Sequence, residues 1–139
     1  MITFNYQTDF RLENEETFSN WIQVCIKNEG YETGEINYIF CDDACLLQLN
    51  IEFLQHDTLT DIISFDNSLG KLIRGDIYIS VERVQENAQD FKVSFNDEIR
   101  RVMIHGVLHY IGFKDNSLEE KKIMKNKENE CLTYWLSVM

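Results

Sequence analysis

The chain has 139 residues, of which 44% are hydrophobic and 12% aromatic, and its formal net charge is −11. This length is that of one domain spanning residues 1–139, and the apolar content excludes a disordered chain. No run of about 18 apolar residues is present, which excludes a transmembrane helix. The first residues lack the basic flank and apolar stretch of a signal peptide, so we expect a cytoplasmic protein with reduced cysteines.

All of the net charge lies in the first half of the chain. Residues 1–70 carry 2 basic and 13 acidic side chains, whereas residues 71–139 carry 11 of each. Because phosphates attract Lys and Arg, the acidic half excludes non-specific binding of nucleic acid. Any contact with nucleic acid is therefore expected from the second half or from a bound cation.

The hydrophobic periodicity predicts a small mixed sheet covered by helices, an α+β arrangement. In chain order the predicted elements are a strand at 2–7, a helix at 15–30, a strand at 36–40, a helix at 42–53, strands at 61–65 and 75–80, and helices at 81–91, 94–109 and 117–138. We expect Asn14 to cap the first helix, and Ser117 with Glu120 to form a capping box.

Two of these helices carry predictions about which side chains face the core. Phe91 lies on the apolar face of the helix at 81–91. In the last helix the inward side chains are predicted to be Ile123, Met124, Cys131, Trp135 and Val138. The lysines and glutamates of that helix, Glu128 among them, are interpreted as its solvated face.

Two of the three histidines lie four residues apart, His105 and His109, so their imidazoles project from one face of the predicted helix. Gly112 can end this helix in a left-handed turn, and a reversal there brings Asp115 over the same face. Two His and one carboxylate with an open fourth position form a catalytic zinc arrangement. The bound water then has its pKa lowered towards about 7 and becomes a nucleophile. The alternative is a pair of ordinary helix histidines.

The class of reaction is narrowed by the residue that follows the first histidine. Helical zinc motifs of metallopeptidases place a Glu general base there, whereas this chain has Gly106, which cannot act as a base. Phosphodiester hydrolysis has less need of a protein base at that position, because the metal can polarise a phosphoryl oxygen. Cys41 and Cys45 are a weaker metal candidate, since no second pair of ligands accompanies them.

The segment HGVLHYIGFKD at 105–115 resembles the H-G-x-L-H-x-x-G-Y-D-H signature of the YbeY family of bacterial endoribonucleases. LN at 49–50, TDIISF at 60–65 and GDI at 75–77 match further blocks of that family in order and spacing. The resemblance implies a four-stranded mixed sheet packed with helices, and a metal-binding helix similar to that of metalloproteases.

The same resemblance implies a function. It is that of a zinc-dependent endoribonuclease, specific for single-stranded RNA, that acts in the cytoplasm. The implied partners are ribosomal RNA and the ribosome, with roles in maturing the 3′ end of the small-subunit RNA and in ribosome quality control. Single-stranded RNA is then hydrolysed at a metal held by His105, His109 and Asp115.

Four positions depart from the family pattern. Phe113 and Lys114 stand where the family has Tyr and Asp; Lys114 could contact phosphate as a point charge, or it is a solvated loop lysine. The third ligand is usually His and here is Asp115, an accepted zinc ligand that also makes a harder ion such as Mn²⁺ plausible. The family usually has an Arg, thought to contact RNA, where this chain has Leu54. Gln55 or His56 could substitute, and His56 could donate a proton near neutral pH. The alternative for His56 is an exposed loop histidine.

Other polar residues of the matched blocks have two interpretations each. Asp61 and Asp76 either orient a ligand His or hold the ends of their strands. Candidates for an RNA-binding face are Arg74, Arg83, Arg100 and Arg101. Alternatively, Arg100 and Arg101 pair on the surface with Asp97, Glu98 or Glu82. We expect the basic residues of 71–127 to face the RNA and the acidic surface to point away from it.

Two other functions stay open at the level of the sequence. One is a metallopeptidase-like hydrolase, which the helix geometry favours and Gly106 opposes. The other is a non-catalytic, ribosome-associated module in which the metal only stabilises the fold. Asp115 and Leu54, two of the departures from the family pattern, would fit a loss of catalysis.

Overall fold

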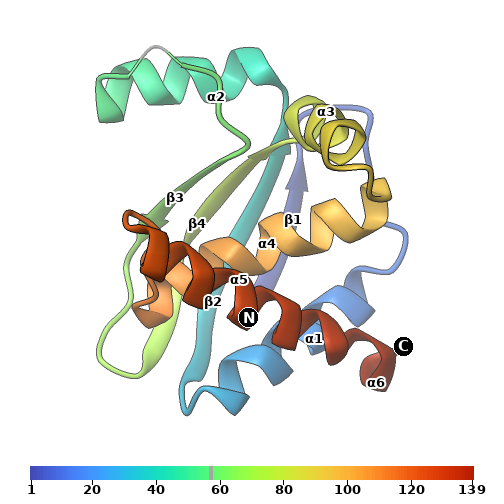
Figure 1. Ribbon diagram of the computed structural model, residues 1–139, viewed down its shortest axis with the longest axis vertical. Coiled ribbons are helices and arrows are strands. Elements are labelled where there is room, and N and C mark those ends of the chain that lie inside the picture. Colours follow the sequence, from blue (N-terminus) through green and yellow to red (C-terminus); the bar gives the residue numbers. More distant parts are fainter. Residues whose placement is uncertain (57) are drawn as a thin grey trace.

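A four-stranded mixed sheet forms the centre of the computed structural model, which describes residues 1–56 and 58–139 (Figure 1). The strand order is β1-β2-β4-β3; β1, β2 and β4 are parallel, and β3 runs antiparallel to β4. The strands are β1 (Ile2–Tyr6), β2 (Glu32–Cys41), β3 (Ile62–Asp66) and β4 (Leu72–Ser80). The predicted fold class, α+β with a small four-stranded mixed sheet packed with helices, is confirmed.

The helices surround this sheet in the predicted order (Figure 1). They are α1 (Glu15–Asn28), α2 (Asp43–Leu49), α3 (Val81–Phe91), α4 (Phe95–Ile111), α5 (Leu118–Thr133) and α6 (Trp135–Val138), and a turn of π-helix, η1 (Asn50–Leu54), continues α2. α1 packs against β2, α4 packs against β3 and β4, and α5 lies on α4. α4 is therefore the layer between the sheet and α5.

The main core lies between the sheet and the inner faces of α1 and α4. α4 approaches the strands closely at Gly106, where an added Cβ would lie 3.0 Å from Ile62 Cδ1 and 3.2 Å from Ile77 Cδ1. A residue with a side chain here would push the helix away from the sheet. The glycine therefore sets the depth at which α4, with its two histidines, sits on the sheet.

The C-terminal end of α4 is tied to the sheet by Tyr110. The Tyr110 Oη lies 3.1 Å from the carbonyl oxygen of Phe65 in β3 and 2.9 Å from that of Asp76 in β4. Gly75 makes room for this ring, because a Cβ there would lie 2.7 Å from Tyr110 Oη and would also meet the carbonyl oxygen of Phe65. These contacts fix the helix turn that also carries His109.

The helix caps follow the sequence predictions except at the first helix. Ser117 and Glu120 form the predicted capping box of α5, and Ser94 accepts a hydrogen bond from the Asp97 N–H at the start of α4. Asn14 stands at the N-cap of α1, but its side chain makes no cap hydrogen bond. Its φ of −128° and ψ of 69° do not give the extended backbone that aims a cap side chain at the first turn.

Two predictions about inward-facing side chains were wrong. Phe91 is 63% exposed, and it is the last residue of α3. Ile123 is 45% exposed, because the buried stripe of α5 is narrow and consists of Met124, Glu128 and Cys131. Trp135 faces inward as predicted, but from α6, where its ring packs against Trp21 with centroids 5.5 Å apart.

We expect Gly75→Ala to lower the free energy of unfolding by about 1–3 kcal/mol, because the added methyl displaces Tyr110 or β3. Urea denaturation measures this loss. The control is Gly70→Asn, at a turn where φ is +56° and a Cβ would have no neighbour within 4 Å; Asn tolerates that backbone. Equal stability of Gly75→Ala and the wild type would contradict the packing described here.

Candidate metal centre

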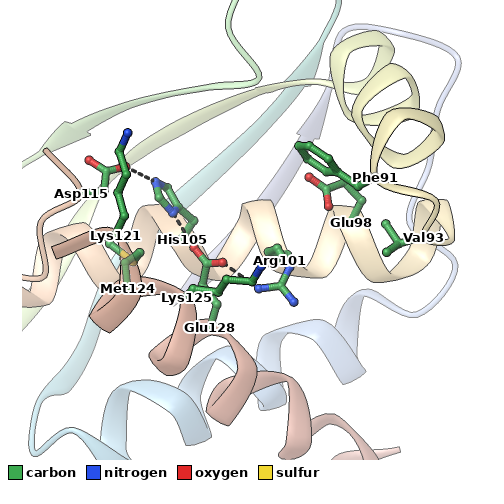
Figure 2. A pocket seen from close by; sticks show the side chains of 10 residues that line it. All are labelled: Phe91, Val93, Glu98, Arg101, His105, Asp115, Lys121, Met124, Lys125 and Glu128. Atoms are coloured by element: carbon green, nitrogen blue, oxygen red, sulfur yellow. Dashed lines mark hydrogen bonds and ion pairs between the residues drawn. The ribbon is translucent and has the colours of Figure 1, made fainter. Parts of the chain in front are cut away.

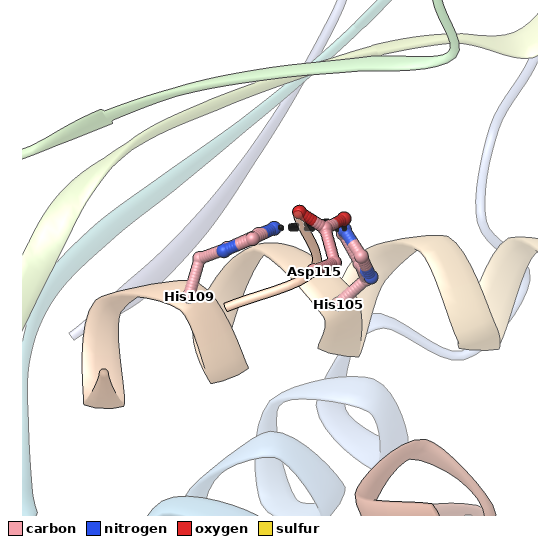
Figure 3. Close-up of side chains that lie close together, drawn as sticks. All are labelled: His105, His109 and Asp115. Carbon is pink, nitrogen blue, oxygen red and sulfur yellow. Dashed lines mark hydrogen bonds and ion pairs between the residues drawn. The ribbon is translucent and has the colours of Figure 1, made fainter. Parts of the chain in front are cut away.

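A turn at the end of α4 brings the three predicted ligands together. Gly112 caps the helix with a φ of +118°, and its N–H bonds to the carbonyl oxygens of Leu108 and His109. This left-handed residue reverses the chain, so that Asp115 returns over the face that carries His105 and His109 (Figure 3). Among residues 1–56 and 58–139, this is the one group of three His, Cys, Asp or Glu side chains close enough to share an ion.

The distances between the ligand atoms fit a single small cation. His105 Nε2 lies 2.9 Å from His109 Nε2 and 3.3 Å from Asp115 Oδ2, and His109 Nε2 lies 3.5 Å from that oxygen. Ligands of a tetrahedral zinc ion, with bonds of about 2.0–2.1 Å, are separated by roughly 3.3–3.4 Å. Two imidazole nitrogens and one carboxylate oxygen also form a donor set that zinc and other divalent ions accept. The three side chains could therefore hold one divalent metal ion.

Glu128 of α5 holds one of these ligands in place. Its Oε2 lies 2.7 Å from His105 Nδ1, and its Oε1 accepts a 2.8 Å hydrogen bond from Arg101 Nη1. The Arg101 guanidinium is fixed in turn by Asn129, whose Oδ1 lies 2.8 Å from Nη2. A carboxylate at Nδ1 keeps the proton on that nitrogen and leaves the Nε2 lone pair free for a metal.

The sequence interpretation of Glu128 as part of a solvated face was wrong, because the residue is only 7% exposed. A signal for its burial exists in the sequence. Met124, Glu128 and Cys131 follow each other at spacings of four and three, which places them on one helical stripe. An acidic residue on an otherwise apolar stripe indicates a buried partner of opposite charge or a hydrogen-bond donor.

Carboxylates surround the site, contrary to the prediction that the acidic surface points away. Asp61, Glu98, Asp115 and Glu128 all line the hollow that borders His105. Burial raises the pKa of Asp61, although the charge of His105 opposes this shift. Burial also raises the pKa of Glu98 to about 7, and the charge of Asp61 adds to the shift. This crowding of carboxylates favours a cation in their midst.

The pKa of His105 shows the balance between burial and these charges. Burial alone lowers it, but the hydrogen bond to Glu128 and the charges of Glu128, Asp115 and Asp61 outweigh burial and raise it. The environment of His105 is therefore one that stabilises positive charge. A proton and a metal ion would compete for its Nε2.

The site is open to solvent on two sides. A hollow of about 550 Å³ lies between α4, α5 and the turn that joins α3 to α4 (Figure 2). On the other side, a hollow of about 360 Å³ is lined by the three ligands together with Leu54 and Asp61. The exposed fractions of the three ligand side chains are 21% for His105, 32% for His109 and 38% for Asp115. A substrate can therefore reach the open position beside the ligands.

The other predicted residues fall in different places. His56 is exposed, and its backbone N–H bonds to the carbonyl oxygen of Asn50; its catalytic role stays a prediction. Asp76 accepts a 2.9 Å hydrogen bond from Asn37 Nδ2, which favours its interpretation as a strand residue. Asp61 shares a hollow with His105 but accepts its side-chain hydrogen bond from Asn87, at 3.3 Å.

The candidate arginines mostly form ion pairs. Arg100 pairs with Asp97 at 2.7 Å, one of the partners predicted for it. Arg101 pairs with Glu128 instead of the predicted Asp97, Glu98 or Glu82, because α5 packs on the α4 face that carries it. Arg83 pairs with Asp43 of α2 at 2.9 Å. Lys114 is exposed.

Cys41 and Cys45 belong to a small apolar cluster around Leu46. They are not part of a group of three metal-ligand side chains within the described residues.

Across the described residues, the helices are all too short or too polar to cross a membrane. The fold and site together define an α+β protein with a candidate metal centre of two histidines and one aspartate on a helix end. The chain belongs to the family described as Endoribonuclease YbeY, whose model matches residues 2–135. The family that the motif blocks predict is confirmed.

The chain is similar to named relatives and to a protein of known structure over nearly its whole length. The chain is 58% identical to Endoribonuclease YbeY of Flavobacterium psychrophilum, over 95% of this chain and 94% of that protein. It is 55% identical to the protein of the same name from Flavobacterium johnsoniae, over 94% of both. A Thermotoga maritima protein of known solution structure is 27% identical, with a TM-score of 0.65 over 99% of this chain and 93% of that one.

We expect Glu128→Gln to raise the dissociation constant for zinc about 10–100-fold, because the variant loses the carboxylate that orients His105. Competition with a coloured chelator measures the constant. The control is Glu130→Gln, two residues further along α5, which removes an exposed carboxylate of the same charge. Equal zinc affinity of Glu128→Gln and Glu130→Gln would contradict the role described for Glu128.

The raised pKa of Glu98 predicts that the stability of the protein depends on pH. Its pKa is about 7 in the folded state and 4.5 ordinarily, so the folded protein holds this proton between those values and loses stability as the pH rises through them. Glu98→Gln removes this loss. We therefore expect the melting temperature of Glu98→Gln minus that of the wild type to be more positive at about pH 8 than at about pH 5. Thermal melts with chelator present measure this difference, and an equal difference at both pH values would contradict it.

Proposed function

We propose that this protein is a metal-dependent endoribonuclease that hydrolyses single-stranded RNA. One observation carries the proposal: His105, His109 and Asp115 converge on one point with an open side, and Glu128 orients the first of them. The relatives are named for the same class of activity. The residues that we propose to hold the metal are His105, His109 and Asp115.

Each side chain of the site has a defined task in this proposal. The metal would supply Lewis-acid polarisation of the phosphodiester and a water of lowered pKa as nucleophile. Glu128 keeps His105 in the tautomer that presents Nε2, and Arg101 keeps Glu128 in its place. The two hollows on either side of the ligands leave room for a strand to pass through the site.

The finer points of the proposal follow from the family. We propose zinc as the ion, with Mn²⁺ as a second candidate because Asp115 supplies a hard oxygen ligand. The RNA would be ribosomal, notably the 3′ end of the small-subunit RNA, with the ribosome as partner in maturation and quality control. One domain, residues 1–139, would carry this activity in the cytoplasm, where ribosomal RNA is matured. His56 is proposed as a proton donor.

The structure disfavours a metallopeptidase, because the position that would carry its general base has no room for a side chain. Gly106 faces Ile62 and Ile77 of the sheet, and a Cβ there would already lie within 3.2 Å of both. A glutamate at this position would therefore push α4 off the sheet.

A purely structural metal is disfavoured by exposure. Structural zinc sites are closed by four protein ligands. Among the residues that the structure describes, three ligands come together here, and all are partly exposed beside open hollows.

The proposal is tested by cleavage of a single-stranded RNA oligonucleotide, with its duplex as control. We expect zinc-loaded wild type to cleave the single strand and spare the duplex. His109→Ala, prepared identically, should be slower by about three orders of magnitude, because it loses a metal ligand. Equal cleavage by both proteins would reveal a contaminating nuclease, and no cleavage with any divalent ion would contradict the proposal.

A further inference from the structure

The 550 Å³ hollow beside the metal ligands has an apolar end that core packing does not explain. Phe91 and Val93 form this end, with exposed fractions of 63% and 44%. Met124 of α5 lines the same hollow from the opposite side. Figure 2 shows the ring of Phe91 on the far side of the hollow from Asp115, with His105 and Arg101 between them. An exposed aromatic ring in such a wall offers a flat surface for stacking.

Two lysines line the same hollow. Lys121 and Lys125 are one helical turn apart, so both side chains project from one face of α5. Neither forms an ion pair with any described residue. In a chain with a net charge of −11, two lysines without an ion pair next to a candidate catalytic centre supply positive charge that can bind an anion.

Two of the carboxylates that line the hollow, Glu128 and Asp115, have partners within the protein. Glu128 receives hydrogen bonds from His105 and Arg101, and Asp115 faces the two histidines. Glu98 is 4% exposed, and burial raises its pKa to about 7, so it is partly protonated near neutral pH. The lysines therefore face a hollow in which Glu128 and Asp115 have other partners and Glu98 is buried.

We propose that this hollow binds one unpaired nucleotide of the RNA, with its base stacked on Phe91 and its flanking phosphates at Lys121 and Lys125. Aromatic side chains interleaved with cationic ones are how proteins bind single-stranded nucleic acid. The volume lies within the range of about 300–1,000 Å³ of small-ligand sites. The proposal rests on the proposed RNA substrate and names a subsite for it.

This subsite explains a preference for single strands. A base in a duplex is stacked between its neighbours, and bringing it onto Phe91 would cost a few kcal/mol of unstacking and unpairing. An unpaired base pays much less of this cost. A strand seated on Phe91 and the two lysines also passes beside His105 and Asp115, which line the same hollow.

The test is binding of a 5′-fluorescein-labelled single-stranded RNA of about 12 nucleotides, followed by anisotropy. All proteins carry His109→Ala, so that the strand stays intact. Phe91→Ala should raise Kd about 5–100-fold, and Phe91→Trp should restore the affinity. Replacing the bases of the RNA by abasic nucleotides should weaken binding to the Phe91 protein much more than to Phe91→Ala.

The lysines are tested by the salt dependence of the same binding. Lys121→Gln and Lys125→Gln should each reduce the slope of log K against log salt by about 0.7. Lys122→Gln is the matched control, because Lys122 is exposed on the same helix but does not line the hollow. The salt slope of Lys122→Gln should equal that of the protein without a lysine substitution.

Four outcomes would overturn the subsite. The first is unchanged Kd for Phe91→Ala, and the second is equal slopes for all three lysine variants. The third is a labelled oligoglutamate peptide that binds in place of RNA with the same dependence on Phe91 and the lysines. Cleavage of RNA by the wild type and by Phe91→Ala with the same KM would likewise overturn the subsite while leaving the endoribonuclease proposal standing.

Discussion

The hydrogen bond between His105 and Glu128 is the contact on which the rest of the site depends. It joins α4 to α5, fixes which nitrogen of His105 carries the proton, and places a carboxylate where a metal-binding histidine needs one. Because Glu128 is almost fully buried, the same contact requires Arg101 as a partner for the second carboxylate oxygen. The packing of α5 on α4 therefore also determines which nitrogen of His105 is free to bind a metal.

Two glycines position α4 relative to the sheet. Gly106 lets the middle of the helix lie directly on Ile62 and Ile77, and Gly75 makes room for the Tyr110 ring at its C-terminal end. The close contact at Gly106 has a chemical consequence, because it removes the position at which a metallopeptidase carries its general base. Fold packing and reaction class are linked through this one residue.

The sequence predicts the parts of the site that are local in the chain. The spacing of His105 and His109 follows from helix geometry, and a left-handed Gly112 accounts for the return of Asp115, so eleven residues are sufficient. Glu128 lies 23 residues from His105, and its role depends on how two helices pack, which periodicity does not specify. Phe91 shows the same limit: its helical face is predictable, but whether another element covers that face is not.

The central claim is that one ion sits between His105, His109 and Asp115. A crystal structure of the zinc-loaded protein, with anomalous difference density recorded at the zinc edge, tests it most directly. The account predicts one strong peak at about 2.0–2.2 Å from each of His105 Nε2, His109 Nε2 and an Asp115 oxygen. A peak at Cys41 and Cys45, or one that excludes Asp115, would contradict it.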